Sequence, residues 1–494
     1  MNSPYDNISA PGYLPEYTDY DPLRGRPVLP LIDEDPVRNI FLDAATLLIP
    51  AASFLELNLI GRIFATELLL IGILPIMLLL RGRLLMRRLP LIILGMGLIW
   101  LFSQIVTDFA VESTFKDYAR GWAKISFTLL NFMAIYLLIA GSRRRLVLFA
   151  AGLGIGIILL FIFDPPPFGL SQPWKFGLGF ALVYLVGTAL QQRTIAQMPF
   201  LAPALFLLIG AFFLSQGFRS GSGMAFMTAA YLFYSGAGPK YRFPSPAKIL
   251  LLAAFAIMAV FAVLESYEAM VEAGLFGEQA QIILRQQSIS QLGVLLGGRS
   301  EILIAGQAIM ESPFLGHGSW AKSEYYSYLM ALLKYGAKGG EIPFLANDLI
   351  PTHSVIFGAW VEAGLLGAVF WAMILVIVIR VMIRLFVSDD PLLPLIAFIG
   401  MMMIWDILFS PFGADRRFVL AYFITVMVLS HGTLYRSLDV DEWADEAAGW
   451  PDDEYGGGTP DDEYGGGTPD DEYGGGNIVD WQDRRQFPID NRRY

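Results

Sequence analysis

Long apolar blocks constrain this chain more than any other feature. They run to roughly 17–24 residues, the length that crosses a hydrocarbon core of about 30 Å. Because lipid offers the backbone no hydrogen-bond partners, such blocks must be helical. Charged residues make up only 16% of the 494 residues, against about 25% in an ordinary soluble domain. The sequence therefore predicts an all-α polytopic membrane protein.

About twelve of these blocks are expected to be transmembrane helices. They lie at about 41–58, 63–80, 90–110, 122–140, 146–163, 175–189, 198–215, 222–237, 248–264, 355–378, 391–409 and 416–433. The first contains Pro50, Glu56 and Asn58, so a re-entrant or interfacial segment is the alternative there. The connection between the ninth and tenth blocks is about ninety residues long, 265–354. A connection this long usually has its own fold and a function. Within it, 278–296 and 324–334 predict short helices.

Basic residues follow the even-numbered blocks and set the orientation. They are Arg81, Arg83, Arg87, Arg88, Arg143, Arg144, Arg145, Arg193, Lys240, Arg242, Lys248, Arg380 and Arg384. The positive-inside rule then places both termini in the cytoplasm and the long connection outside. The expected organisation is a polar cytoplasmic segment at 1–40, nine spans in 41–264, a large helical periplasmic loop at 265–354, three spans in 355–433 and a cytoplasmic tail at 434–494.

The tail is built from an acidic repeat. PDDEYGGGT occurs at 451–459 and 460–468, and PDDEYGGG at 469–476. Such a segment buries too little apolar surface to order itself, so a disordered tail is expected, with a docking or regulatory role as the alternative. The chain has no cysteine and only three histidines, which excludes thiolate metal sites and argues against a histidine-rich metal centre. Neither a metal nor another cofactor is expected.

Three polar residues are candidates for chemistry on the outer side. Arg219 lies in a glycine-rich turn, Arg299 follows two glycines, and His353 precedes a span. Guanidinium groups bind phosphate through paired hydrogen bonds, and a neutral imidazole accepts a proton near neutral pH. Together the three suit transfer from an anionic, phosphate-linked donor. Each also has a structural interpretation: a lipid contact for Arg219, a salt bridge for Arg299 and an interfacial hydrogen bond for His353.

Weaker candidates cluster in the same loop. Tyr325, Tyr326 and Tyr328 offer aromatic faces for sugar rings, although core packing of a loop helix is the alternative. Further candidates near the site are His317, Lys322, Lys334 and Lys338. Asp406 lies inside a predicted span, where an ionisable side chain is either functional or paired with a neighbouring helix.

An ordered set of short motifs resembles one family. In chain order the motifs are Phe218-Arg219-Ser220, Gly298-Arg299, Pro313-x-x-Gly316-x-Gly318, His353 and Glu362-x-Gly364-x-x-Gly367. This order resembles the O-antigen ligase and Wzy-type polysaccharide polymerase superfamily, most strongly over 297–370. Many members have His-Asn where this chain has His353 and Ser354. A serine at this position is compatible with exopolysaccharide-polymerase relatives.

The resemblance implies a GT-C-like, metal-independent, inverting glycosyltransferase of the bacterial inner membrane. It implies that Arg219 and Arg299 bind the diphosphate of an undecaprenyl-diphosphate-linked glycan and that His353 is the general base. The implied partners are this donor, a glycan acceptor, membrane lipids and polysaccharide export or chain-length machinery, without nucleic acid.

Several functions stay open at this point. Polymerisation of exopolysaccharide or O-antigen repeat units is favoured by the Thr-His-Ser sequence around His353, and ligation of the glycan to lipid A–core is the alternative. A polysaccharide transporter or flippase is a second class. Transporters usually show repeated halves, and no internal repeat is visible in the span pattern. The third is a non-catalytic scaffold whose tail recruits a partner.

Overall fold

The computed structural model describes one helical unit. It covers residues 20–21, 26–27, 40–58, 61–191, 198, 200–235, 269–274, 281, 300–335, 348–386 and 390–431. All of these belong to the first of two compact units, Met1–Val440. The predicted span 248–264 and the repeat tail lie outside the described residues.

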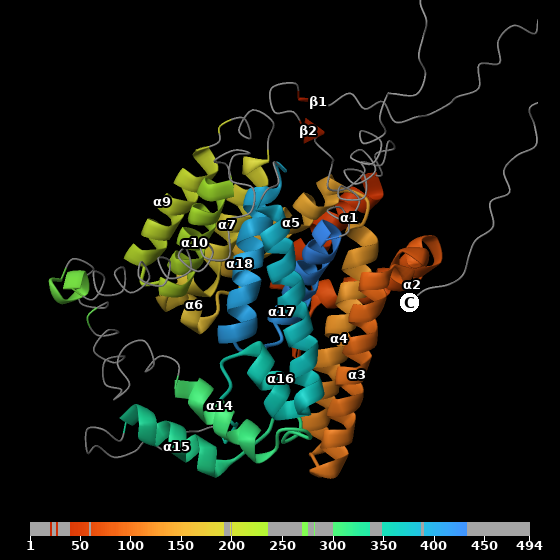
Figure 1. Ribbon diagram of the computed structural model, residues 1–494, viewed down its shortest axis with the longest axis vertical. Coiled ribbons are helices and arrows are strands. Elements are labelled where there is room, and N and C mark those ends of the chain that lie inside the picture. The colour runs from red at the N-terminus through yellow and green to blue at the C-terminus, as the bar shows by residue number, and fades with distance from the viewer. Residues whose placement is uncertain are drawn as a thin grey trace, which may run out of the picture. The chain divides into compact units, whose positions relative to one another are not determined.

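Helices dominate the described residues, as the apolar blocks predict (Figure 1). In chain order they are α1 (Ile40–Ala51), η1 (Ala52–Phe54), α2 (Ala65–Arg81), η2 (Gly82–Met86), α3 (Arg88–Ala110), α4 (Phe115–Ile139), α5 (Arg143–Phe163), α6 (Pro167–Ser171), η3 (Trp174–Leu178), α7 (Gly179–Leu190), α9 (Leu201–Ser215), α10 (Arg219–Ser235), α14 (Ser300–Glu311), α15 (Glu324–Tyr335), α16 (Val355–Ala363), α17 (Leu365–Leu385), α18 (Leu393–Phe409) and a last helix over 416–431. The described strands form two antiparallel pairs, β1 (Tyr20–Asp21) with β2 (Arg26–Pro27) and β3 (Glu56–Asn58) with β4 (Arg62–Phe64).

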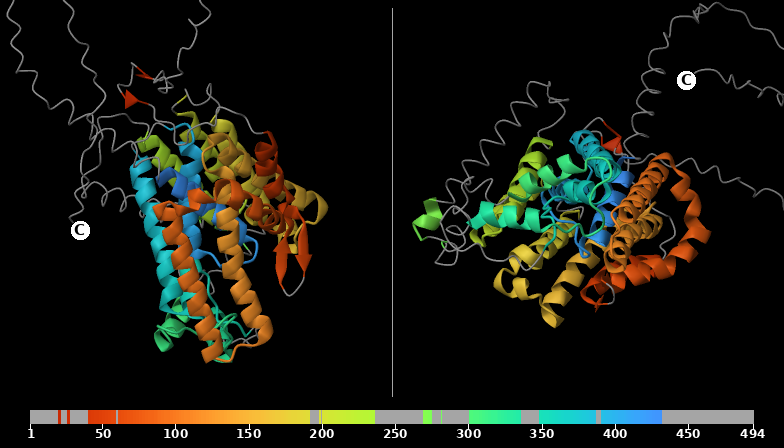
Figure 2. Two further views of the ribbon diagram at one scale, coloured as in Figure 1. Left: turned by 90° about the vertical axis from the view of Figure 1, so that its right-hand side faces the viewer. Right: turned by 90° about the horizontal axis from the view of Figure 1, so that it is seen from below.

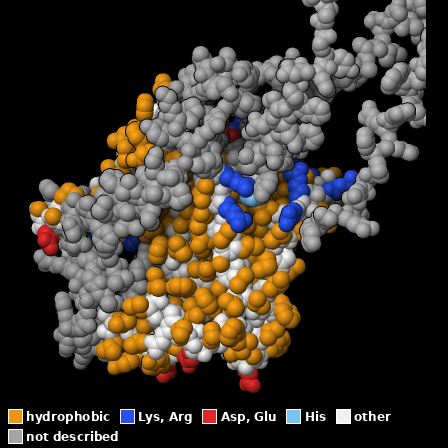
Figure 3. Space-filling view, in the orientation of Figure 1, with side chains coloured by type: hydrophobic (Ala, Val, Ile, Leu, Met, Phe, Trp, Pro, Cys, Tyr) orange, Lys and Arg blue, Asp and Glu red, His pale blue; other side chains and the backbone are white. Residues whose placement is uncertain are grey.

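Five described helical segments are long and apolar enough to cross a membrane. They are Ala65–Met86, Arg88–Ala110, Phe115–Ile139, Arg143–Phe163 and Leu365–Leu385. Shorter apolar helices accompany them at Ile40–Phe54, Trp174–Leu190, Leu201–Ser215 and Leu393–Phe409. Apolar side chains cover much of the outer face of this unit (Figure 3), and Leu79, for example, is 89% exposed. Large apolar patches facing outward are costly in water and natural in lipid, so this is a helical membrane protein.

The first predicted span differs from the structure. The sequence predicts one helix over 41–58, but the α-helix ends at Ala51, next to Pro50. The chain then forms hairpin β3–β4, which stands apart from the long helices in the left view of Figure 2. Glu56 and Asn58 lie in this hairpin, where polar side chains need no apolar surroundings. A continuous helix over 41–58 is therefore wrong, and the interruption lies where the polar residues are.

The span predicted at 355–378 is also two helices. Helix α16 ends at Ala363, Gly364 adopts φ +69°, and α17 starts at Leu365. A positive φ is incompatible with continuing a right-handed helix. The break lets α16 lie against α14, while α17 packs on α3 and α18.

Basic side chains gather at one end of the helices (Figure 3). Arg81, at the end of α2, donates hydrogen bonds to the last carbonyls of α4, and Arg143 pairs with Asp390. Arg144 and Arg145 both pair with Asp43 on α1. At the opposite end, α14 lies beside α15 and α16 (Figure 1). This second end holds the candidate site.

Candidate functional site

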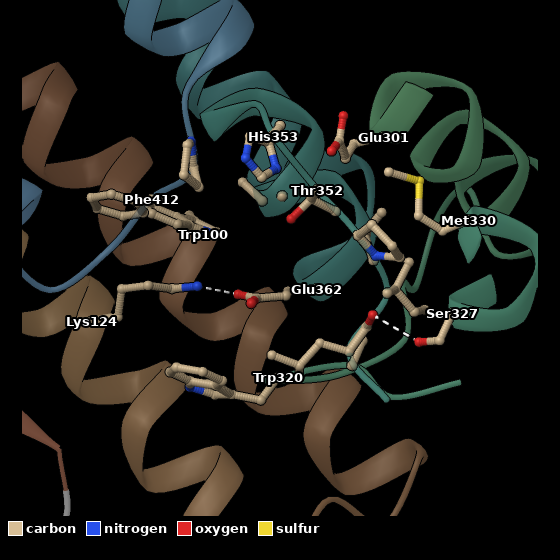
Figure 4. Close-up of a pocket in the computed structure, with 18 residues that line it drawn as sticks. Trp100, Lys124, Glu301, Trp320, Ser327, Met330, Thr352, His353, Glu362 and Phe412 are labelled. Atoms are coloured by element: carbon tan, nitrogen blue, oxygen red, sulfur yellow. Dashed lines mark hydrogen bonds and ion pairs between the residues drawn. The ribbon is translucent and has the colours of Figure 1, made fainter. Parts of the chain in front are cut away.

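A cavity of about 520 Å³ opens at the end of the helices away from the basic residues. Its walls come from α3, α4, α14, α15 and α16, from residues 320–321 and 349–353, and from the turn at 411–412. Its polar side chains are Lys124, Glu301, Ser327, Thr352, His353 and Glu362. Trp100, Trp320 and Phe412 add aromatic surface (Figure 4). Segments far apart in the sequence therefore meet in one amphipathic site.

His353 lines this cavity and is exposed in it. The next residue, Ser354, fixes the position of His353, because Ser354 is the N-cap of α16. Its hydroxyl accepts a hydrogen bond from the backbone N–H of Phe357 at 3.3 Å and donates to the Ile407 carbonyl at 2.9 Å. Serine and asparagine are both strong N-cap residues, so either residue after the histidine satisfies the start of this helix.

Lys124 and Glu362 form an ion pair inside the cavity (Figure 4). The two side chains are 14% and 18% exposed, and the ammonium also lies 5.7 Å from the centre of the Phe412 ring. A lysine in a candidate membrane-spanning helix requires such compensation, because an unpaired charge there is costly. Although they are paired, the ammonium of Lys124 and the carboxylate of Glu362 both line the cavity.

Two glycine turns dock against each other beneath this pair. The backbone N–H groups of His317 and Gly318 donate to the carbonyls of Val361 and Glu362 at 2.7 and 3.1 Å. Gly316 and Gly364 both have positive φ, and a Cβ on Gly364 would collide with the Phe314 carbonyl. The glycines of the two sequence motifs thus permit a close backbone contact that holds Glu362 at the cavity.

Gly364→Ala is expected to destabilise the protein by at least about 1–3 kcal/mol, because Gly364 has φ +69° and ψ −162°, a region open essentially only to glycine. Thermal unfolding in detergent measures the effect. Gly306→Ala in α14 is the matched control, since a Cβ there meets no atom within 4 Å. Equal melting temperatures for the two variants would contradict the docking role of Gly364.

Asp108 anchors the loop that forms one wall of the cavity. Buried at the end of α3, it accepts hydrogen bonds from the Ser319 N–H at 2.6 Å and the Ser319 hydroxyl at 2.7 Å. It also accepts from Ser113 and from the Trp122 indole, each at 2.8 Å. One carboxylate therefore ties the α3–α4 turn to the residue before Trp320. A carboxylate at the end of an apolar block gave no sequence signal for this role.

The two predicted arginines do not join His353 among the described cavity residues. Arg219 begins α10, is half-buried and does not line the cavity. Arg299 lies outside the described residues, although Glu301, two positions later in the sequence, lines the cavity.

The other predicted contacts lie in the surrounding loop. Tyr325 and Tyr328 are exposed and do not line the cavity, whereas Tyr326 is 3% exposed in a small loop core. Burial, together with a hydrogen bond to Glu311, raises the pKa of the Tyr326 phenol above its ordinary value. Of the three tyrosines, Tyr326 thus has a structural role in the loop core, and a sugar contact of Tyr325 or Tyr328 stays a prediction.

The remaining polar candidates have structural partners. His317 Nε2 lies 2.7 Å from the Ala308 carbonyl, and Lys322 donates to Asp117 at 2.7 Å. Asp406 accepts a hydrogen bond from Arg416. Lys338 and the side chain of Lys334 lie outside what the structure describes.

No known protein-family model matches the chain, and no curated protein matches it significantly.

Proposed function

We propose that this chain is an inverting glycosyltransferase of the bacterial inner membrane, with about twelve spans, a GT-C-like architecture and cytoplasmic termini. It transfers an undecaprenyl-diphosphate-linked oligosaccharide to a glycan acceptor at the periplasmic face. The observation that carries the proposal is the cavity that His353 shares with two carboxylates, one ammonium and three aromatic side chains. Aromatic faces together with hydrogen-bonding groups suit a sugar.

In the proposed reaction, His353 accepts the proton of an acceptor hydroxyl. The acceptor oxygen then bonds to the anomeric carbon from the face opposite the diphosphate, which inverts the configuration. The bond between that carbon and the diphosphate oxygen breaks, and its electron pair leaves with undecaprenyl diphosphate. Positioned cations stabilise the charge that the leaving group gains. By resemblance, Arg219 and Arg299 have this role.

Polymerisation of repeat units is the preferred form of this function, and ligation to lipid A–core is its alternative. The expected side of the membrane follows from charge, because Arg81, Arg143, Arg144 and Arg145 lie at the end of the helices away from the cavity. A polysaccharide flippase has less support. Glycosyl transfer to a hydroxyl requires a proton acceptor such as His353, whereas translocation of a glycan across the membrane does not.

Reconstitution tests the proposal. Full-length protein in nanodiscs, given an undecaprenyl-diphosphate-linked oligosaccharide, is expected to release undecaprenyl diphosphate and to form glycans longer by whole repeat units. Protein-free nanodiscs are the control. A ligase releases the lipid only when lipid A–core is added. If neither acceptor yields undecaprenyl diphosphate from the cognate donor, the proposed function is wrong.

A further inference from the structure

Helices α14 and α15 each expose a stripe of uncharged side chains. Residues three or four positions apart share one face of a helix. The exposed residues at these spacings are Leu303, Gln307 and Met310 on α14, and Tyr325, Tyr328 and Leu332 on α15. The Gln307 amide donates a hydrogen bond to the Tyr325 hydroxyl at 3.3 Å, so the two stripes meet. Together they form one surface, which we name the outer face.

The packing of the loop itself does not use the outer face. The opposite sides of α14 and α15 already form the small loop core, whose buried residues include Ile304, Ala308, Ile309, Tyr326 and Met330. A helix side turned to water normally carries charged residues. None of the six outer-face residues is charged, and Met310 is 81% exposed. A contiguous apolar surface of this kind marks contact with a membrane or a partner.

The chain that leads into α15 is held at the ends of two candidate membrane-spanning helices. Lys322, two residues before α15, donates to Asp117 in the first turn of α4 at 2.7 Å. Ser319 donates to Asp108 near the end of α3. Figures 1 and 2 show α15 level with these helix ends and running across the direction of α3 and α4. Because α3 and α4 are long enough to span the hydrocarbon, their ends mark the headgroup level.

The chemistry of the outer face fits this level of a bilayer. Tyrosine is enriched at membrane–water interfaces, where its ring lies in apolar surroundings and its hydroxyl reaches water. Phe109 and Phe115, at the same ends of α3 and α4, are also strongly exposed. Apolar side chains cover this end of the molecule as well as the long helices (Figure 3). The outer face therefore extends the lipid-facing surface of the helices, which favours lipid over a protein as its partner.

We propose that the outer face of α14 and α15 inserts into the membrane surface on the cavity side, as an amphipathic helix does in the plane of the interface. Glu301, Ser327 and Met330 of the same two helices line the cavity, so lipid contact holds this wall of the cavity at the membrane surface. The inference assigns lipid, in place of a sugar, to Tyr325 and Tyr328. It does not depend on the proposed function.

Site-directed spin labelling tests the inference. The chain has no cysteine, so each single-cysteine variant carries one nitroxide. Full-length protein in nanodiscs is exposed to oxygen, which concentrates in hydrocarbon, and to a nickel chelate, which stays in water. Labels at Met310→Cys, Tyr328→Cys and Leu332→Cys are expected to collide mainly with oxygen. The ratio of the two collision rates should place them about 5–10 Å into the boundary between headgroups and acyl chains.

Two further labels give the references. Leu79→Cys, on the exposed apolar side of α2, is the lipid reference, and Asp348→Cys, an exposed charged position in the same loop as α15, is the water reference. Thermal unfolding of each labelled variant checks that it is folded.

Two outcomes would overturn the inference. Nickel collisions as frequent at the three outer-face positions as at Asp348→Cys would place the outer face in water. Infrequent collisions with both reagents would mean that protein covers it, either a second copy of this chain or another partner. Oxygen-dominated collisions at all three positions support lipid contact, whether or not the reconstituted protein transfers a glycan.

Discussion

His353→Ala is expected to lower the rate of glycan transfer by about 10²–10⁴-fold, the usual contribution of a positioned general base. The variant should still fold, because His353 is exposed in the cavity and the cap of α16 is made by the Ser354 side chain. Release of undecaprenyl diphosphate by reconstituted protein measures the rate. Thermal unfolding checks that the loss is chemical and not structural.

His431→Ala provides the matched histidine control. His431 ends the described part of the last helix, within electrostatic range of Arg380 and Arg384, and it does not line the cavity. Transfer by this variant should equal that of the wild type. A folded His353→Ala protein that loses less than about tenfold in rate would contradict a general-base role.

Hydropathy predicted most described helices but not their interruptions. Continuous apolar sequence placed α3, α5 and α18 within a few residues, because lipid leaves the backbone no alternative to a helix. Helix α4 starts at Phe115, earlier than the predicted 122, since Thr114 caps it and charged side chains on its first turns find partners in the loop. Such partners are distant in sequence, so hydropathy cannot reveal them.

The candidate site was predictable only in part. His353 was found because a histidine directly before a span is conspicuous. Lys124 and Trp320 were missed, because their importance comes from a cavity that distant segments build together. The tyrosines illustrate helical phase: Tyr325 and Tyr328 are three residues apart and share the outer face of α15, whereas Tyr326 faces the loop core.

Glu67→Ala is expected to destabilise the protein by about 3–5 kcal/mol, the cost of leaving a buried charge without its partner. Glu67 is fully buried and accepts hydrogen bonds from Arg417 at 2.7 and 2.9 Å, from Asn131 at 3.2 Å and from the Phe64 N–H at 3.1 Å. These contacts join α2, α4, hairpin β3–β4 and the last helix. Thermal or denaturant unfolding in detergent measures the loss.

The surface pair Arg62–Glu56 gives the contrast. Its atoms are 3.7 Å apart and Arg62 is half exposed, so Glu56→Ala should cost no more than about 1 kcal/mol. Replacing both partners of the buried pair, with Glu67→Leu and Arg417→Met together, should recover much of the stability that Glu67→Ala loses, because no unpaired charge then remains. Equal losses of stability in the Glu67→Ala and Glu56→Ala variants would contradict this prediction. The Arg417 guanidinium would then be hydrated or paired with another group, and the buried pair would not hold these four elements together.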